Sequence, residues 1–296
     1  MMHKYLRSIG FSNIKNKADL KEILTDVVMT STDRSYLQLD DNEKVAMMSK
    51  NISPSLGISV CGEFDDEGHF VYDYHFPYLR SYVKSVEEEI AVERHSSQIS
   101  YAGVCEEVNF GVILIFYLQN FPGYFELKKA ESLKKSYVSL SGLSTNGHIL
   151  FPLAKSNMQR KSERIYSEKR KNLMQDARKG IEDAIESLTM QDMGLYNTIC
   201  KKIQDSDVYS LVDTTFIPCG VESDHYAVLG EILNIKDETN MYTNEKIFIL
   251  TINCNDIIMD IAINEQDLLG EPAVGRRFKG DIWLQGSVHV PDTGNV

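Results

Sequence analysis

Hydrophobic and polar residues follow two different periodicities along this chain, and the changes between them divide it into three parts. Residues 1–154 hold one helical stretch and then short runs with the two-residue alternation of strands, whereas residues 155–205 have the spacing and charged composition of helices. Residues 206–296 return to short strand-like runs separated by turn residues. The pattern predicts an α+β protein with an N-terminal antiparallel sheet and helices, a central helical hairpin or arm, and a small C-terminal OB-like β-barrel.

The first part begins with a predicted helix from Lys17 to Met29. Asn16 precedes it and Asp19 follows three residues later, which is a variant of the capping box. A second short helix is predicted from Glu43 to Met48. The strands expected after it form an antiparallel meander, with a turn-rich hairpin loop at 64–68. These strands are Leu56 to Glu63, His69 to His75, residues 89–93, Gln98 to Glu107, and a buried strand at 110–119.

The first part is predicted to end with a short helix from Tyr124 to Lys135 and a last hairpin. The strands of this hairpin are Ser136 to Leu143 and His148 to Leu153, and the Asn-Gly pair between them at 146 and 147 favours a tight turn. All of these elements fall before residue 154, so they are assigned to one α+β domain.

The middle part is rich in charged helix formers. Ser156 and Gln159 have the spacing of a capping box, and they open a helix that is predicted to run to about Leu188. A second helix is predicted to begin at Thr189 and to end at about Ile203. Two successive helices indicate an αα-hairpin that joins the two β-rich parts.

The last part holds five strand candidates, and their number and spacing suit a small barrel, with a strongly bent β-sandwich as the competing interpretation. The candidates are Tyr209 to Ile217, Tyr226 to Ile235, Lys246 to Cys254, Asp256 to Asn264 and Asp281 to Val290. The closing stretch is the most distinctive, because glycines at 270, 275, 280 and 286 permit tight bends around apolar residues. The side chains expected to fill the barrel core are Phe278, Ile282 and Leu284.

Composition and charge narrow the class of protein. The longest apolar run, 112–118, is far shorter than the roughly 20 residues of a membrane helix, and the N-terminus has no secretory signal pattern, so we expect no membrane association and a cytoplasmic location. The five scattered cysteines form no C-x-x-C pair and indicate reduced thiols. The net charge of −12 is unevenly spread, with −5 in residues 1–154, +3 in 155–205 and −10 in 207–296.

One cluster in the closing stretch is a candidate binding surface. A lone tryptophan beside arginines is the mixture that protein interfaces enrich, and this cluster comprises Arg276, Arg277, Phe278, Lys279 and Trp283. The alternative is that Trp283 belongs to the barrel core. The cluster does not match a phosphate-binding loop. In such a loop the second glycine is followed by lysine, a hydroxyl residue and a helix, whereas here Gly280 is followed by Asp281 and a predicted strand.

The basic helix at 160–179 is a second candidate surface, for polyanions or nucleic acid. Acidic residues are interspersed among its arginines and lysines, which favours a solvated face with intrahelical ion pairs. OB-like barrels often bind single-stranded nucleic acid. The barrel region of this chain has a net charge of −10, which repels a phosphate backbone, so a nucleic-acid partner is not expected. A helix of this sign also complements the acidic C-terminal barrel, within the chain or in a neighbour.

Candidate chemistry is sparse. The seven histidines show neither H-x-x-x-H nor H-E-x-x-H spacing, so we predict no metal site and no cofactor. Asp224 stands directly before His225 and is placed to orient its imidazole, but no G-x-S-x-G serine or activated cysteine accompanies the pair. The catalytic residues are therefore unassigned.

The two ends of the chain carry a resemblance. The start MHKYLRSIGFSNIKNK and the close GEPAVGRRFKGDIWLQGSV are similar to an uncharacterised bacterial domain-of-unknown-function family, number three thousand eight hundred and eighty-one, from gut-associated Gram-positive anaerobes. The resemblance implies a cytoplasmic bacterial protein with a length similar to that of the family members. It implies no activity, and it carries no catalytic or binding residue over to this sequence.

The absence of a catalytic motif favours a non-enzymatic intracellular binding or scaffold protein, with a protein partner or self-association. One alternative is an unrecognised hydrolase or transferase that uses carboxylates or His225 in a cleft between domains, where ligand sites often fall. A further alternative is polyanion or nucleic-acid contact through the basic helix. The predicted domains are 1–154, 155–205 as the arm, and 206–296 as the barrel.

Overall fold

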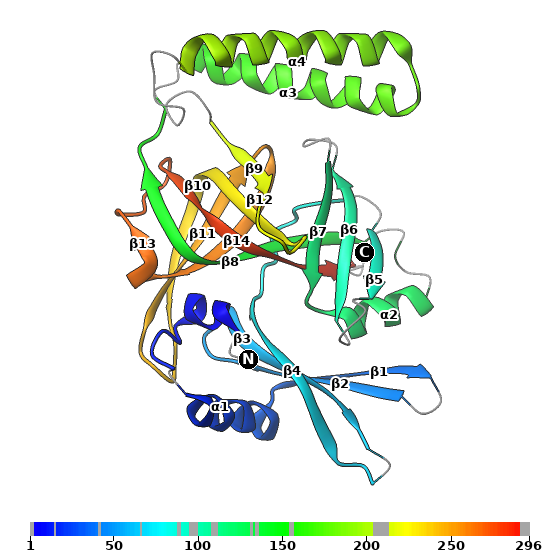
Figure 1. Ribbon diagram of the computed structural model, residues 1–296, viewed down its shortest axis with the longest axis vertical. Helices are drawn as coiled ribbons and strands as arrows, with labels where there is room; N and C mark the ends of the chain where they lie inside the picture. The colour runs from blue at the N-terminus through cyan, green and yellow to red at the C-terminus, as the bar shows by residue number, and fades with distance from the viewer. Residues whose placement is uncertain are drawn as a thin grey trace, which may run out of the picture.

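The chain forms a mixed α+β structure with two sheets and a projecting helical hairpin (Figure 1). The structure is a computed structural model that describes residues 3–14, 16–40, 43–65, 67–87, 90–94, 100–107, 112–130, 133, 136–153, 157–203 and 213–290. The α+β fold class, the helical hairpin and the C-terminal barrel are as the sequence predicted. Of the helices described, none combines the length and the apolar content needed to cross a bilayer.

The chain begins with a short 3-10 helix, η1 (Lys4–Ile9), and helix α1 (Lys17–Thr30). The side chain of Asn16 accepts a hydrogen bond from the backbone N–H of Asp19 at 2.8 Å, as the capping pattern predicted. Leu20 and Val27 are the buried residues of α1, and this apolar face contacts the first sheet. The predicted first helix is therefore confirmed.

The first sheet is antiparallel, in the order β1 (Asp33–Asp40), β2 (Glu43–Asn51), β3 (Leu56–Phe64) and β4 (Phe70–Leu79). The hairpin between β3 and β4 is confirmed. The helix predicted at 43–48 is wrong, because this segment is part of β2, which pairs with β1 on one side and β3 on the other. Its four residues from 45 to 48 are all buried, so the packing of both sheet faces overrides a weak helical pattern.

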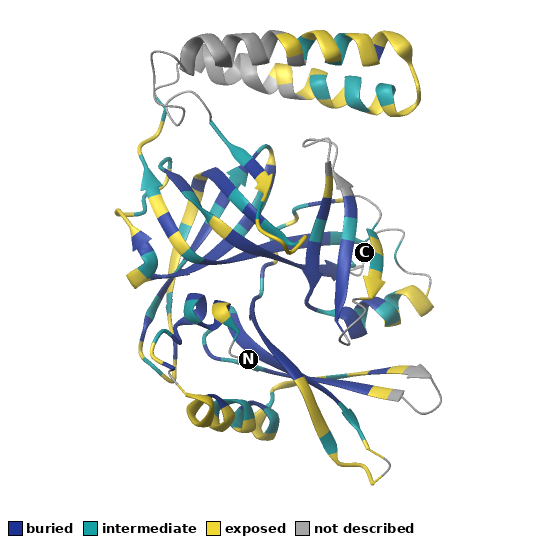
Figure 2. Cartoon of the chain, in the orientation of Figure 1, coloured by how far each residue is buried: buried dark blue, intermediate teal, exposed yellow. Residues whose placement is uncertain are grey.

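Five strands close into the barrel, in the order β8 (Tyr137–Leu150), β12 (Ile257–Asn264), β11 (Lys246–Cys254), β10 (His225–Thr239) and β14 (Arg277–His289). An antiparallel pairing between β14 and β8 completes the ring. The residues expected in its core, Phe278, Ile282 and Leu284, are fully buried, and Figure 2 shows buried positions along these strands. The closed barrel agrees with the prediction.

The strand that closes the barrel was not the one expected. Strand β9 (Thr215–Pro218) pairs only with β10, beside the ring, and β8 from the first part of the chain takes the fifth place. β8 therefore belongs to the barrel although it lies inside the predicted domain 1–154, and the rest of the proposed domain division stays a prediction. The short η4 (Glu265–Asp267) and β13 (Leu268–Leu269) lie between β12 and β14.

The predicted hairpin at 136–153 is wrong, because β8 runs through the Asn-Gly pair without a turn. Asn146 instead accepts a hydrogen bond from the backbone N–H of Asp281 on β14, at 3.0 Å. Gly147 lies so close to its neighbours that an added Cβ would stand 2.6 Å from Phe278 and 2.7 Å from Ile263. Both residues are therefore used for the close packing of strands around the barrel rather than for a turn.

The other strands of the larger sheet are β5 (Ile90–Arg94), β6 (Tyr101–Glu107) and β7 (Val112–Leu118), which are antiparallel to one another. β7 joins the end of β14 in parallel, and helix α2 (Phe121–Lys129) follows it. The single meander predicted from 56 to 119 is thus wrong, because its strands divide between the two sheets.

Two buried glutamines connect the first sheet to the barrel. Gln285 of β14 donates to the carbonyl of Pro77 on β4 at 2.8 Å, and Gln119 donates to the carbonyl of Leu79 at 3.1 Å. Gln119 also donates to the side-chain oxygen of Gln285 at 2.6 Å. Because every one of these groups is buried, the hydrogen bonds fix the position of β4 against β14.

The arm consists of α3 (Asn157–Arg178) and α4 (Glu182–Ile203), which stand between β8 and β9 in the chain. The hairpin itself was predicted, but its turn is at residues 179–181 rather than at Thr189. Gly180 has φ of 80°, a left-handed conformation that glycine adopts without strain, and this residue ends α3. The capping pattern at Thr189 was a false helix start, since that threonine lies inside α4 and donates to the carbonyl of Ile185.

Candidate functional site

The structure disperses the predicted binding cluster of the closing stretch. Phe278 is fully buried and Trp283 is 5% exposed, so both lie in the core. The guanidinium of Arg277 is turned inward, where its Nε donates to the carbonyl of Phe151 at 3.1 Å. Arg276 and Lys279 are the partly exposed members, and Arg276 lies over the ring of Phe151. The five residues do not form one surface, and a binding role for them stays a prediction.

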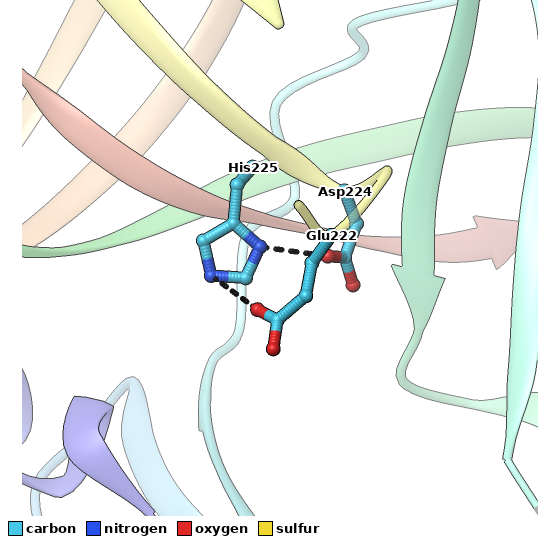
Figure 3. Close-up of side chains that lie close together, drawn as sticks. All are labelled: Glu222, Asp224 and His225. Carbon is cyan, nitrogen blue, oxygen red and sulfur yellow. Dashed lines mark hydrogen bonds and ion pairs between the residues drawn. The ribbon is translucent and has the colours of Figure 1, made fainter. Parts of the chain in front are cut away.

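Trp283 instead contributes to a polar and aromatic cluster at the start of β10. His225 pairs directly with Trp283 across the β10–β14 ladder, and Asp224 precedes it. The turn before β10 contains Gly220, whose φ of 80° is left-handed, and the carbonyl of Asp224 accepts a hydrogen bond from the Leu284 backbone N–H at 2.8 Å. These backbone contacts hold the acidic turn against β14 and bring Glu222, Asp224 and His225 together (Figure 3).

Asp224 is the centre of the cluster. Its Oδ2 accepts a hydrogen bond from the indole Nε1 of Trp283 at 2.7 Å, and its Oδ1 lies 2.9 Å from Nδ1 of His225. Burial raises the pKa of the Asp224 carboxyl, but the hydrogen bonds from His225 and Trp283 outweigh it, so that the pKa is lowered overall. The group is therefore an ionised carboxylate, and such a carboxylate only accepts hydrogen bonds.

The ionised carboxylate determines that Nδ1 of His225 carries a hydrogen. Nδ1 of His225 must carry a hydrogen in order to donate to Asp224, which leaves Nε2 either as a lone pair or, in the imidazolium, as a second N–H. Nε2 lies 3.0 Å from Oε2 of Glu222, yet this buried nitrogen has no hydrogen-bond partner among the described residues. The glutamate oxygen is therefore close to Nε2 but off the line of an N–H bond.

Aromatic rings from the N-terminal segment surround this cluster. The ring of Tyr5 stacks on Trp283 with 5.5 Å between centroids, and it lies 5.6 Å from the ring of His225. His3 lies 4.7 Å from Trp283, and Tyr117 of β7 lies 5.0 Å from it. Burial, with the nearby carboxylates of Glu222 and Asp224, raises the pKa of Tyr5, so its phenol stays protonated.

Two further histidines lie beside these rings. Burial lowers the pKa of His3 to about 3 and that of His75 to about 4, so both are neutral near pH 7. Nδ1 of His75 is 2.7 Å from the hydroxyl of Tyr72, whereas Nε2 of His75 and Nδ1 of His3 are buried without a hydrogen-bond partner among the described residues. The rings of His3 and His75 are 6.5 Å apart.

The sequence identified part of this cluster. The expectation that Asp224 orients His225 is confirmed by their hydrogen bond, but Glu222, Tyr5 and Trp283 were not connected with the pair. The sequence predicted no metal site because residue spacing showed none, whereas the structure brings possible ligand atoms of Glu222, Asp224 and His225 within 4.8 Å of one another. The sequence signal that could have pointed to this cluster is the E-x-D-H run from Glu222 to His225, which lies between Gly220 and a predicted strand.

The arm presents a second candidate surface. Figure 1 shows α3 and α4 side by side, beyond the end of the barrel where β8 ends and β9 begins. Of the side chains described in the arm, only Ala184 is buried, and Figure 2 shows exposed positions on both helices. Tyr166 donates to Gln191 across the hairpin at 3.3 Å. The exposed apolar side chains are Ile165, Tyr166, Ile181, Ile185, Met190 and Met193.

Comparison with known proteins identifies a family that the chain matches. A family model described as a domain of unknown function, E. rectale gene description (DUF3881), matches residues 6–286. No curated protein and no solved structure matches the chain.

Proposed function

The chain belongs to the DUF3881 family, and we propose that it is a cytoplasmic binding or scaffold protein that assembles with a second copy of itself through the α3–α4 arm. The observation that carries the proposal is the set of exposed apolar side chains on this hairpin. Met190 and Met193 are 69% and 62% exposed, and they lie three residues apart on α4. Exposed methionines of this kind are common at adaptable protein contacts.

A two-helix hairpin buries few of its apolar side chains by itself. In the part of the arm whose side chains are described, α3 and α4 cover Ala184 but leave Ile165, Ile185 and the two methionines in solvent. Two hairpins packed together bury such side chains in a four-helix bundle, which is a common stable arrangement of helices. The arm of a second copy is therefore a suitable partner for this surface.

The charge distribution favours a symmetric contact. α3 carries seven basic and three acidic residues, whereas α4 carries four acidic and two basic ones. In a two-fold symmetric dimer each residue pair occurs twice, so α3 of one copy can lie against α4 of the other at both places. This pairing sets a basic helix beside an acidic one and avoids contact between two basic helices.

Sedimentation velocity over a range of about 1 to 100 µM tests the proposal. The wild type is expected to move from the monomer mass of 33.7 kDa toward twice that value as concentration rises. The double variant Met190→Glu, Met193→Glu should weaken self-association at least about tenfold, because it places charges in the apolar contact. The matched control is Met29→Glu, Met241→Glu, whose methionines are 73% and 61% exposed on other elements.

A charge exchange tests the symmetric arrangement separately. A variant with Lys169→Glu and Lys171→Glu in α3, and another with Glu182→Lys and Glu186→Lys in α4, should each associate poorly alone, while their mixture should form a heterodimer. A wild type that stays monomeric throughout the range refutes the proposal. Equal association of the arm variant and the control would show that the contact lies elsewhere.

A further inference from the structure

We propose that Glu222 and His225 bind a divalent transition-metal ion of the Zn²⁺ type, with Asp224 as the outer carboxylate that orients the imidazole. The site lies at the acidic turn before β10 (Figure 3), and its residues lie outside the arm helices α3 and α4. Nε2 of His225 and a carboxylate oxygen of Glu222 are the two ligand atoms. The remaining coordination positions are open to water or to a small ligand, as in metal sites that are not purely structural.

The first argument is the short contact between Nε2 of His225 and Oε2 of Glu222. Nδ1 of His225 lies 2.9 Å from Oδ1 of Asp224, and on the other side of the ring Nε2 lies 3.0 Å from Oε2 of Glu222. Nε2 is buried and has no hydrogen-bond partner among the described residues. A cation between the two atoms would use both of them, since imidazole nitrogen and carboxylate oxygen are common ligands of Zn²⁺.

The second argument is the geometry of the pair. Two ligand atoms that each lie about 2.1 Å from an ion are about 3.0 Å apart at an angle of about 90° and about 3.4 Å apart at the tetrahedral angle, so the 3.0 Å between Nε2 and Oε2 is close to the span across a shared ion. In such a pair the oxygen is well off the lone-pair axis of the nitrogen, because the ion occupies that axis. The absence of a hydrogen bond at Nε2, despite the short distance, agrees with this arrangement.

The third argument is the outer carboxylate. Histidines that bind metals usually donate their other N–H to a carboxylate or carbonyl, which holds the tautomer and the ring. Asp224 accepts this hydrogen bond here and is itself held by Trp283 at 2.7 Å, so each of its oxygens is already engaged in a hydrogen bond. Imidazole and carboxylate together suit Zn²⁺, Co²⁺ and Ni²⁺ better than Ca²⁺ or Mg²⁺.

The competing arrangement is a proton at Nε2, which gives an imidazolium between two carboxylates. That arrangement would be most stable with Nε2–H aligned on the glutamate oxygen, and the structure lacks this hydrogen bond. The side chain of Glu222 is 68% exposed and that of His225 only 11%, so an ion can reach the nitrogen from the glutamate side.

Trp283 is the only tryptophan of the chain, and its hydrogen bond to Asp224 makes its fluorescence a reporter for the site. We would titrate the full chain with Co²⁺, which quenches a nearby indole, and measure Zn²⁺ binding by calorimetry near pH 7.5. The expected result is saturable binding of one ion per chain, with quenching by Co²⁺ that Zn²⁺ competes away.

Variants locate the ion. Glu222→Gln should weaken Zn²⁺ binding at least about tenfold and His225→Gln should abolish it, whereas the controls Glu265→Gln and His148→Gln, on exposed residues of other segments, should bind as the wild type does. If His225→Gln does not fold, the exposed Glu222 variant decides. The proposal is overturned by a wild type without saturable binding below about 1 mM, or by a Glu222→Gln variant that titrates like the wild type.

Discussion

Replacing Trp283 with alanine tests the conclusion that this residue belongs to the core. Its ring lies 4.7 Å from His3, 5.5 Å from Tyr5 and 5.0 Å from Tyr117, and the residue is 5% exposed. Truncation of a buried tryptophan costs about 3–5 kcal/mol, and the loss of a donor to the Asp224 carboxylate costs about 1–3 kcal/mol more. Because the two effects share a site and are not additive, we expect a loss of about 5 kcal/mol.

Urea denaturation followed by far-UV circular dichroism measures this loss, since the variant has no tryptophan. A loss of about 5 kcal/mol is a large part of the total stability of about 5–15 kcal/mol that folded domains have, so Trp283→Ala should unfold at much lower urea or fail to fold. Trp283→Phe keeps an aromatic ring but removes the N–H, and it should cost about 2 kcal/mol. Tyr82→Ala, at a residue 68% exposed, is the control and should change stability by less than about 0.5 kcal/mol.

The reasoning is refuted if Trp283→Ala unfolds at the same urea concentration as the wild type. A stable Trp283→Ala protein that has lost a partner would instead revive the idea of a binding surface in the closing stretch. Equal losses in Trp283→Phe and Trp283→Ala would show that the hydrogen bond to Asp224, rather than the packing of the ring, dominates.

Two further predictions follow from buried groups. Burial lowers the pKa of His75 from 6.5 to about 4. Between these two pH values the unfolded chain binds a proton at this histidine and the folded chain does not. The free energy of unfolding should therefore fall as the pH is lowered from about 6.5 to about 4. Urea titrations at several pH values should show a smaller fall in His75→Gln, and an unchanged slope would contradict the assignment. Gly286→Ala should cost about 1–3 kcal/mol, because the added Cβ would stand 2.5 Å from the ring of Phe116. Thermal denaturation should show that Phe116→Leu recovers part of this loss, whereas additive losses would mean that the ring is not the obstacle.

Local patterns were sufficient for several elements that depend on neighbours in the chain. The helix at Lys17 and its Asn16 cap were read correctly, because capping and helical spacing act within a few residues. Strand β11 runs from Lys246 to Cys254 with the predicted bounds, since buried and partly buried residues alternate along most of it. The contact between Asp224 and His225 was also visible, because the two residues are adjacent.

The sequence by itself determined the α+β fold class, the helical arm and the residues of the barrel core, since periodicity and composition reflect which side chains are buried away from water. Only the tertiary structure decided that β8 closes the barrel through an Asn-Gly pair, and that Glu222, His225 and Trp283 meet beside Tyr5. Strand partners and such clusters depend on contacts between segments that are far apart in the chain. The strand pairings that form are those that bury the most apolar surface while every buried polar group finds a partner. No short window of sequence contains that information.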